Sequence, residues 1–281
     1  MQQKLEEILN EKIVSSDSLG GGSIANSFVI QTESGKKYFG KTYGNNQVIL
    51  QNEANGLSEL AKTRAIRIPK VIALTDNFLL LEFIETGRRE RGFSELFGKQ
   101  FAKMHRTTSD KFGFLENNFI GSTPQINLPE SNSWIEFFWI NRLLYQFKLA
   151  EQNGYVNFEL RNLFNKLENK LPSILEGTEE KPTLVHGDLW SGNFMVDKNS
   201  NPVLIDPAAY YGNREADLAM TKMFGGFNSE FYSAYNEEFP LSDDWKYRID
   251  LYMLYHVLNH LNLFGSGYYS QVIAIIKKYV K

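Results

Sequence analysis

The chain has 281 residues, of which 42% are hydrophobic and 22% charged, and its formal net charge is −3. This length exceeds the roughly 150 residues of a typical domain, so we expect one large or two modest domains with a substantial core. The small net charge gives no electrostatic footprint for nucleic acid or an anionic membrane, and the absence of cysteine excludes disulfides, thiolate metal sites and thiol nucleophiles.

The N-terminal segment, MQQKLEEILNEKIV, is charged and amphipathic, whereas a signal peptide needs a continuous apolar stretch. The longest apolar runs, such as residues 78–81, fall far short of the ~20 residues that span a bilayer. We therefore expect a cytoplasmic protein with access to cellular nucleotides.

The first part of the chain is predicted to form strands around one main helix, after a short N-terminal helix. SFVIQT and KYFGKTY flank a turn that contains glycine, which is the pattern of a hairpin. Between residues 47 and 62, apolar residues recur at spacings of three and four and mark one face of a helix. VIAL and FLLLEFI then predict two more strands around a turn.

After a loop at residues 85–92 the composition changes and helices are predicted. Apolar and aromatic residues at helical spacing start at Phe93 and again at Trp134, and residues 245–262 and 268–280 favour two further helices. An irregular region at 184–213 contains two short strand candidates, NFMV and PVLI. The sequence thus predicts an α+β fold with a small β-rich N-terminal lobe (1–85) and a larger, mostly helical C-terminal lobe (86–281). A ligand cleft is expected between them.

The irregular region carries the residues with the clearest chemistry. Asp188 and Asn193 lie five positions apart, and Asp206 follows a predicted strand. In kinases a loop aspartate accepts the proton of the substrate hydroxyl, and an asparagine five residues later holds metal. A carboxylate and a carboxamide are oxygen ligands suited to Mg²⁺, so Asp206 is expected to be the second metal ligand. Aspartate and asparagine are also common in ordinary loops, where they bond to their own backbone.

Upstream residues occur in the order expected of a kinase. Consecutive glycines allow backbone amides to approach phosphates, although such a run is also typical of a flexible turn. Lys41 lies in a predicted strand and Glu53 in the next helix, as in the ion pair with which kinases hold the α- and β-phosphates. Taken alone, Lys41 could be an ordinary strand cation and Glu53 a surface glutamate. The pattern is specific because the glycine loop, the lysine, the glutamate and the later aspartates and asparagine occur in the order found in kinases. The predicted phosphate loop consists of Gly20, Gly21, Gly22 and Ser23.

Several motifs together resemble the fructosamine kinase (ketosamine-3-kinase) family. They are HGDLWSGN, IDPAAYYGNREADLAM, FGGF, LYHVLNHLNLFG, FGFLENNFIG and the W-x2-FF run. The resemblance extends from about Ser18 to the C-terminus. Aminoglycoside-kinase relatives share H-x-D-x4-N but not the rest of this combination.

This resemblance implies a protein-kinase-like fold and ATP-dependent phosphorylation of the third-carbon hydroxyl of sugar adducts on amines, with Mg²⁺ as cofactor. The product releases the amine, which links the family to protein deglycation. Carried over by motif, Asp188 is the catalytic base, Asn193 and Asp206 are metal ligands, and Lys41 and Glu53 are the ATP-binding pair. Glu82, Phe83 and Ile84 resemble the hinge that binds adenine through its backbone.

Other residues near these motifs have less defined roles. Trp190 is a candidate for stacking on the substrate, or a core residue that braces the loop. Asp217 is expected to accept backbone amides of the catalytic loop. Arg214 is expected to pair with Asp217 or Glu215, or to bind substrate. His186, His256 and His260 are expected to be packing residues, because a metal site would need a third ligand.

The sequence also bears on the oligomeric state and on the binding partners. Many family members have a cysteine in the glycine loop where this chain has Ser23, so dimerisation through that thiol is not available and we expect a monomer. The expected partners are ATP and a ketosamine, free or on a glycated protein. The alternatives are the same machinery acting on an aminoglycoside, a choline-like alcohol or thioribose, and a nucleotide-binding scaffold without turnover.

Overall fold

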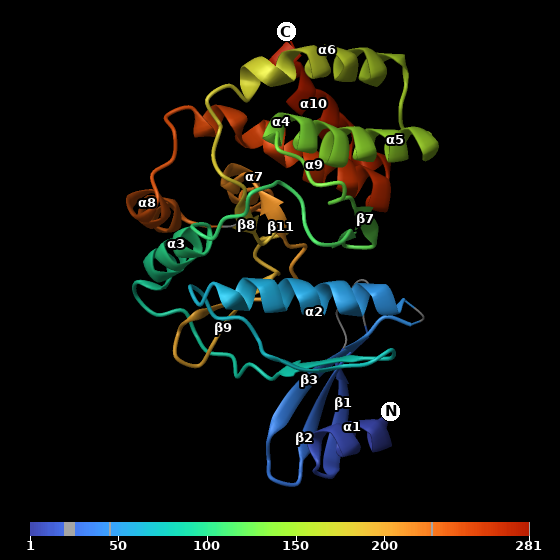
Figure 1. Ribbon diagram of the computed structural model, residues 1–281, viewed down its shortest axis with the longest axis vertical. Coiled ribbons are helices and arrows are strands. Elements are labelled where there is room, and N and C mark those ends of the chain that lie inside the picture. Colours follow the sequence, from blue (N-terminus) through green and yellow to red (C-terminus); the bar gives the residue numbers. More distant parts are fainter. Residues whose placement is uncertain (20–25, 45, 226, 281) are drawn as a thin grey trace.

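The computed structural model describes residues 1–19, 26–44, 46–225 and 227–280. Figure 1 shows an elongated molecule with a sheet at one end, helices at the other, and helix α2 between the two. Both the predicted α+β class and the arrangement in two lobes are confirmed. The four glycine-loop residues, Gly20, Gly21, Gly22 and Ser23, lie outside the described residues.

The N-terminal lobe is a five-stranded antiparallel sheet in the order β1-β2-β3-β5-β4. Alternating burial along β2 places Phe28 and Ile30 on the core side, as the two-residue period of a strand requires. The predicted hairpin and the two later strands are confirmed. The elements are α1 (Gln2–Leu9), β1 (Ile13–Leu19), β2 (Asn26–Thr32), β3 (Lys37–Thr42), α2 (Gln47–Lys62), β4 (Val71–Leu74) and β5 (Leu79–Glu82).

Helix α2 joins the two lobes because it has two buried faces. Leu50, Ala54 and Leu57 belong to a core that also includes residues of both lobes, such as Leu79 and Phe97. The helix spans the residues predicted from its apolar spacing. A second face of α2 is turned towards the C-terminal lobe and contributes to the site described below.

The C-terminal lobe is mainly helical. The predicted helix that starts at Trp134 contains a π-helical stretch, η1, so the expectation of one helix there is confirmed in extent but not in regularity. Helices α6, α7 and α8 were not individually predicted. The helices are α3 (Phe93–Met104), α4 (Trp134–Phe137), η1 (Phe138–Leu144), α5 (Tyr145–Gln152), α6 (Phe158–Ile174), α7 (Arg214–Met220), α8 (Ser229–Glu238), α9 (Trp245–Phe264), η2 (Ser266–Tyr268) and α10 (Tyr269–Val280).

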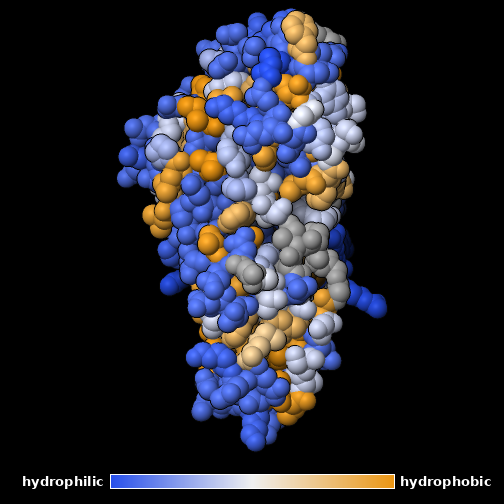
Figure 2. Space-filling view, turned by 90° about the vertical axis from the view of Figure 1, so that its right-hand side faces the viewer, coloured by the Kyte–Doolittle hydropathy of each residue, from blue (hydrophilic) through white to orange (hydrophobic). Residues whose placement is uncertain are grey.

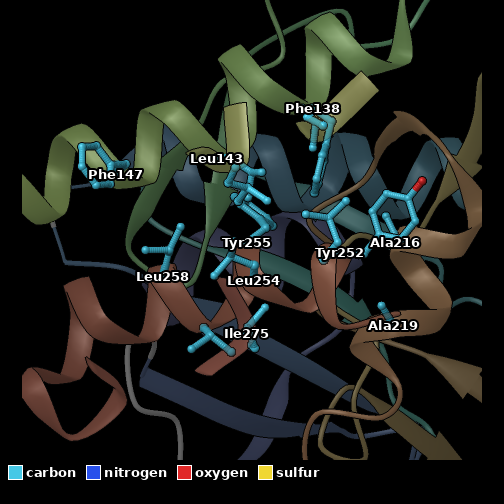
Figure 3. Packing of buried hydrophobic residues seen from close by; sticks show 14 of the residues in the cluster. Phe138, Leu143, Phe147, Ala216, Ala219, Tyr252, Leu254, Tyr255, Leu258 and Ile275 are labelled. Atoms are coloured by element: carbon cyan, nitrogen blue, oxygen red, sulfur yellow. The ribbon is translucent and has the colours of Figure 1, made fainter. Parts of the chain in front are cut away.

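One large apolar cluster holds these helices together. Figure 3 shows Phe138, Leu143 and Phe147 from η1 and α5 facing Leu254 and Leu258 from α9. All five side chains are buried. Burial of this much apolar surface is the main stabilising contribution in a domain of this size. It makes α9 a rigid base for the shorter segments above it.

Three two-stranded ladders lie in the C-terminal lobe, and a bridge between Arg67 and Val203 joins one of them to the N-terminal lobe. The predicted strands NFMV and PVLI pair as β9 (Phe194–Val196) and β10 (Pro202–Leu204). β8 (Thr183–Val185) pairs with β11 (Tyr210–Gly212), and β6 (Asn118–Ile120) with β7 (Thr123–Gln125). The hairpins β6–β7 and β8–β11 were not predicted, because strands of three residues carry little periodicity.

The lobes are also connected at the hinge. The Arg67 guanidinium bonds to the Glu82 carboxylate at 2.7 Å and to Asp197 in the turn between β9 and β10. The Gly87 amide donates to the Val196 carbonyl at 2.9 Å. These bonds fix the chain that leaves β5 against the C-terminal lobe.

Hydrophilic and hydrophobic residues are unevenly distributed over the molecular surface. On the face shown in Figure 2, hydrophilic residues predominate at both ends and hydrophobic residues lie nearer the middle. Within the described ranges, no helix combines the length and apolar character needed to cross a bilayer.

Candidate active site

The topology brings the two candidate loops together. Residues 186–193 run from β8 to β9, and residues 205–209 run from β10 to β11. Because β8 pairs with β11 and β9 pairs with β10, both ends of one loop are fixed beside both ends of the other. The Ile205 amide donates to the Asn193 carbonyl at 3.1 Å, and the Ala208 amide to the His186 carbonyl at 3.0 Å. Residues that are far apart in sequence therefore meet at one point.

Gly187 is required for this close approach. Its φ is +83°, a conformation that residues with a Cβ rarely adopt. A Cβ at this position would lie 2.1 Å from the Ala208 carbonyl oxygen. A larger residue would push the two loops apart.

Asp188 is held by Asn193. The Asn193 Nδ2 donates to the Asp188 carbonyl at 2.8 Å and to its Oδ2 at 3.0 Å. The surrounding protein removes water from the Asp188 carboxyl, and this desolvation raises its pKa well above the ordinary value although the Asn193 hydrogen bond opposes the rise. The side chain keeps some surface in a cavity, so a substrate can reach it.

Lys41 and Asp206 face this loop from the other side. The Lys41 ammonium bonds to Glu53 at 2.7 Å and also contacts the Asp206 carboxylate. Burial lowers the pKa of Lys41, but the Glu53 and Asp206 charges outweigh this and raise it, so the ammonium stays protonated. Asp206 has a φ of +54°, a strained conformation for a residue with a side chain and one often found at functional sites. The predicted lysine–glutamate contact is confirmed.

Two cavities meet at these charges. A larger one, of about 510 Å³, is here called the hinge cavity, and a smaller one, of about 220 Å³, the loop cavity. Both are lined by Ser27, Lys41, Glu53 and Asp206. A ligand that extends from one to the other must pass these charged groups.

Most of the wall of the hinge cavity is apolar, although Asp17 and Thr86 also line it. Its walls include Val29, Phe39, Leu57, Leu81, Met195 and Ile205, and the predicted hinge residues Glu82, Phe83 and Ile84 also line it. The Glu82 amide already donates to the Lys70 carbonyl at 2.8 Å. The Glu82 amide is therefore occupied within the protein and is not the donor for a planar base. Such a slot is typical of small-ligand sites.

The loop cavity contains the catalytic-loop residues. Asp188, Asn193 and Trp190 line it, together with Asn118, Phe119 and Gly121 of the β6–β7 hairpin. Trp190 packs edge-to-face on Phe224 at a centroid distance of 5.4 Å, so its ring is held from outside the cavity. The ring also lies against Gly192 of the same loop, and the substrate role of Trp190 stays a prediction.

Arg214 requires a correction. The structure buries its guanidinium away from both cavities, where it bonds to Glu180 at 2.8 and 2.6 Å and to the Phe239 and Pro240 carbonyls at 2.7 Å. It does not pair with Glu215, which binds Arg248, or with Asp217. A cation with all these partners is structural, because leaving a buried charge without them is costly. The expected substrate role is thus not supported by its position.

Asp217 has the predicted supporting role. It accepts the His186 amide at 2.6 Å and the Gly187 amide at 2.9 Å. Its other neighbour, His105, contacts it through Nε2 at 3.1 Å and bonds to the Tyr235 hydroxyl through Nδ1 at 2.7 Å. Burial raises the pKa of Asp217, but its bonds to His105 and to the His186 amide outweigh this and lower it. Asp217 is therefore ionised, and it fixes the start of the catalytic loop.

The remaining histidines are packing residues, as expected. His186 is buried, its Nε2 lies 3.0 Å from the Ile205 carbonyl, and burial lowers its pKa. His256 is also buried, and desolvation lowers its pKa to about 3. The His260 Nδ1 lies 2.7 Å from the His256 carbonyl, and the His260 ring packs on Phe224. No group of three or more acidic or histidine residues able to hold a metal was found among the described residues.

Some residues of the site were not predicted. Tyr43, Ile49 and Asn52 line the loop cavity, and His105 supports Asp217. Their sequence positions give no signal, since a single tyrosine, isoleucine, asparagine or histidine in a helix or strand has many ordinary roles. The β6–β7 hairpin lies within the motif FGFLENNFIG, but that motif gave no position in space.

Comparison with known proteins agrees with this geometry. The chain is 40% identical over 271 residues to a chloroplastic protein-ribulosamine 3-kinase of Arabidopsis thaliana, covering 94% of this chain and 82% of that protein. It is 31% identical to the ketosamine-3-kinase of Mus musculus, covering 93% of this chain and 94% of the mouse protein.

Solved structures give the same picture. A Thermobifida fusca protein assigned as a fructosamine-3-kinase superposes with a TM-score of 0.91 at 29% identity, covering 99% of this chain and 98% of that one. An aminoglycoside phosphotransferase solved with ADP superposes with a TM-score of 0.67 at 14% identity, over 99% and 98% of the two chains, which shows a shared fold. The family model for fructosamine kinase matches residues 1–281, and the chain belongs to that family.

Proposed function

We propose that this protein is an ATP-dependent kinase that phosphorylates the third-carbon hydroxyl of ketosamines and so promotes deglycation. The observation that carries the proposal is the meeting of the hinge and loop cavities at Lys41 and Asp206, with Asp188 beside them. Two relatives are named as a protein-ribulosamine 3-kinase and a ketosamine-3-kinase, and these names support a ketosamine as the acceptor.

The hinge cavity is the proposed nucleotide site. Its apolar walls suit an adenine ring, and the backbone of Phe83 and Ile84 is proposed to bond to the ring edge. The Lys41 ammonium, fixed by Glu53, then lies where the phosphates pass from one cavity to the other. The glycine loop, Gly20, Gly21, Gly22 and Ser23, is proposed to cover the phosphates.

Asn193 and Asp206 fit a magnesium ion. Because Asn193 Nδ2 is committed to Asp188, its Oδ1 is left as an acceptor for a cation. The Asp206 side chain is 44% exposed, and a carboxylate with a carboxamide is an oxygen donor set that Mg²⁺ accepts. When bound, the ion neutralises charge on the ATP phosphates.

Asp188 is the proposed base. Its carboxylate accepts the proton of the acceptor hydroxyl as that oxygen attacks the terminal phosphoryl group, and ADP leaves. The Asn193 hydrogen bonds fix the carboxylate in place, and Asp217 fixes the backbone that carries it. Trp190 is proposed to stack on the apolar face of the sugar or of the group that bears the amine.

The proposal has three further parts. Residues 1–85 form the nucleotide-binding lobe and residues 86–281 the lobe with the catalytic loop and most of the acceptor pocket. The protein is proposed to act as a monomer, because Ser23 stands where a cysteine could link two chains. It works in the cytoplasm, where ATP is available.

An acceptor screen tests the function. Purified protein is incubated with ATP labelled in the γ-phosphate, Mg²⁺ and matched concentrations of fructosamine, ribulosamine and erythrulosamine adducts of one lysine derivative. We expect phosphate transfer to at least one adduct and none to the corresponding reduced sugar amine without the ketone. Transfer to an aminoglycoside or a choline-like alcohol with none to any ketosamine would disprove the acceptor class and keep the kinase chemistry.

A further inference from the structure

We propose that Asn52, on the N-terminal lobe, binds a hydroxyl of the acceptor's sugar chain and so takes part in selecting the acceptor. This inference rests on the proposed function, because it assigns part of the loop cavity to the polyol chain of a ketosamine. It goes beyond that function by giving the nucleotide-binding lobe a role in the choice of sugar.

The position of Asn52 follows from the pitch of α2. Residues 49, 52, 53 and 56 lie at spacings of three and four and share one helix face. Glu53 on this face binds Lys41, and a Cβ on Gly56 would lie 3.1 Å from the Pro207 ring, so the face packs closely against the segment that carries Asp206. Asn52 and Ile49 line the loop cavity and do not line the hinge cavity.

One atom of the Asn52 carboxamide, Oδ1, lacks a hydrogen-bond partner among the described residues. The residue is only 6% exposed, and its Oδ1 is buried without a hydrogen bond among the residues that the structure describes. Buried polar side chains are nearly always hydrogen-bonded, and an exception calls for a ligand or another explanation. Asn52 lines the loop cavity, so a rotation of its side-chain amide would turn the buried oxygen towards a ligand that supplies the missing bond.

Asn118, which also lines the loop cavity, provides a contrast. It is buried to the same degree, but its Nδ2 donates to the Ala209 carbonyl at 2.9 Å. Its Oδ1 accepts from Gln125 at 2.9 Å and from Asn127 at 2.8 Å. The hydrogen-bonding groups of Asn118 are therefore already used within the protein, whereas Asn52 is able to bond to a ligand.

The residues that line the loop cavity indicate which class of ligand it binds. A carboxamide both donates and accepts, as does a sugar hydroxyl, whereas an anion would accept only. Phe119 and Trp190 offer aromatic surface for the C–H face of a sugar. The charged groups of the cavity, Asp188 and Lys41 among them, are used in the phosphoryl transfer. A neutral polyol chain thus fits the remaining space.

The test compares two acceptors in two enzymes. The acceptors are ribulosamine and its analogue that lacks one hydroxyl beyond the third carbon, both on the same lysine derivative. The variant is Asn52→Leu, which keeps the volume and removes both hydrogen-bonding groups. Gln51→Leu is the matched control, because Gln51 is the exposed neighbour on the same helix.

We expect Asn52→Leu to lower kcat/KM for the full acceptor at least tenfold and that for the analogue less than twofold. The first analogue lacks the hydroxyl on the fourth carbon. If Asn52→Leu shows no such difference with it, an analogue that lacks the hydroxyl on the fifth carbon is compared in the same way. The KM for ATP should stay within twofold of the wild type, and Gln51→Leu should behave as the wild type throughout. Asn52→Ala, which cannot block the cavity, should give the same change in the ratio of the two acceptors.

The outcomes are distinguishable. If the wild type phosphorylates ribulosamine and the ratio of kcat/KM for each pair of acceptors is unchanged in both Asn52 variants, the role of Asn52 is wrong and the proposed function stands. An equal loss for every acceptor would make Asn52 structural. If the wild type phosphorylates no ketosamine, the proposed function fails, and the role of Asn52 fails with it.

Discussion

The catalytic loop and helix α7 each carry an aspartate, and the pKa values of the two carboxylates are shifted in opposite directions. Asp188, on the loop, receives side-chain hydrogen bonding from Asn193, and desolvation raises its pKa. Asp217, on α7, accepts two backbone amides and contacts His105, and these groups lower its pKa although it is only 2% exposed.

The difference shows that burial alone does not decide how a carboxylate behaves. Donors aimed at the charged form compensate for lost water, and their number and geometry set the direction of the pKa change. Asp217 has enough donors to remain a fixed anion that holds the loop. Asp188 has fewer, so it is ready to accept a proton from a bound hydroxyl.

The largest expected effect is that of Asp188→Asn. This variant removes the base without changing its shape, so kcat should fall by about 10²–10⁴-fold. The melting temperature should be unchanged or higher, because a desolvated carboxylate with a raised pKa opposes folding at neutral pH. Turnover is measured by ADP release and stability by thermal unfolding. Near wild-type activity would show that another group is the base.

Asp217→Asn should damage both stability and activity. The new NH₂ group would face a backbone amide of His186 or Gly187 and leave one donor unsatisfied, which costs about 1–3 kcal/mol. The catalytic loop would shift, and a displacement of about 1 Å can lower kcat about 10²-fold. Urea unfolding and steady-state kinetics measure the two losses. If Asp217→Asn were as stable as the wild type, the contrast between the two aspartates would have no energetic basis.

A smaller effect is expected for His105→Gln on the pH dependence of stability. Burial lowers the pKa of His105 from its ordinary value near 6.5, so the unfolded chain binds a proton that the folded state refuses. Stability contributed by the neutral ring is complete above about pH 6.5 and is lost as the pH falls towards the lower folded value. The variant should therefore show a flatter slope, by at most about 1.4 kcal/mol per pH unit.

Urea unfolding at pH 8, 7, 6 and 5 measures this slope. The free energies of unfolding of the wild type and the variant should differ by a constant amount between pH 7 and 8. This difference should become smaller at lower pH. In the wild type Asp217 does not interfere in this range, because its pKa is lowered and its contribution is lost only below about pH 4. Glutamine is the chosen replacement because its side-chain amide can donate to Asp217 in place of the imidazole. Parallel curves over the whole range would show that His105 titrates normally.

Much of the fold was predictable because local periodicity determines it. The apolar spacing of residues 47–62 was sufficient to place α2, and two β-rich runs around a glycine-containing turn were sufficient to place the hairpin. The order of Lys41, Glu53, Asp188, Asn193 and Asp206 was sufficient to propose the chemistry. Arg214 was misplaced because sequence shows which charges are near in the chain, whereas its partner Glu180 is 34 residues away.

The sequence by itself determined the periodic elements and the identity of the reactive groups, since both depend on residue type and short spacing. Only the tertiary structure decided which side chains face the same cavity and which already have partners. Asn52 and Asn118 are chemically identical, yet among the described residues the Asn52 Oδ1 is unpaired whereas the Asn118 carboxamide is fully bonded. That difference depends on contacts between residues distant in sequence, which a linear pattern does not contain.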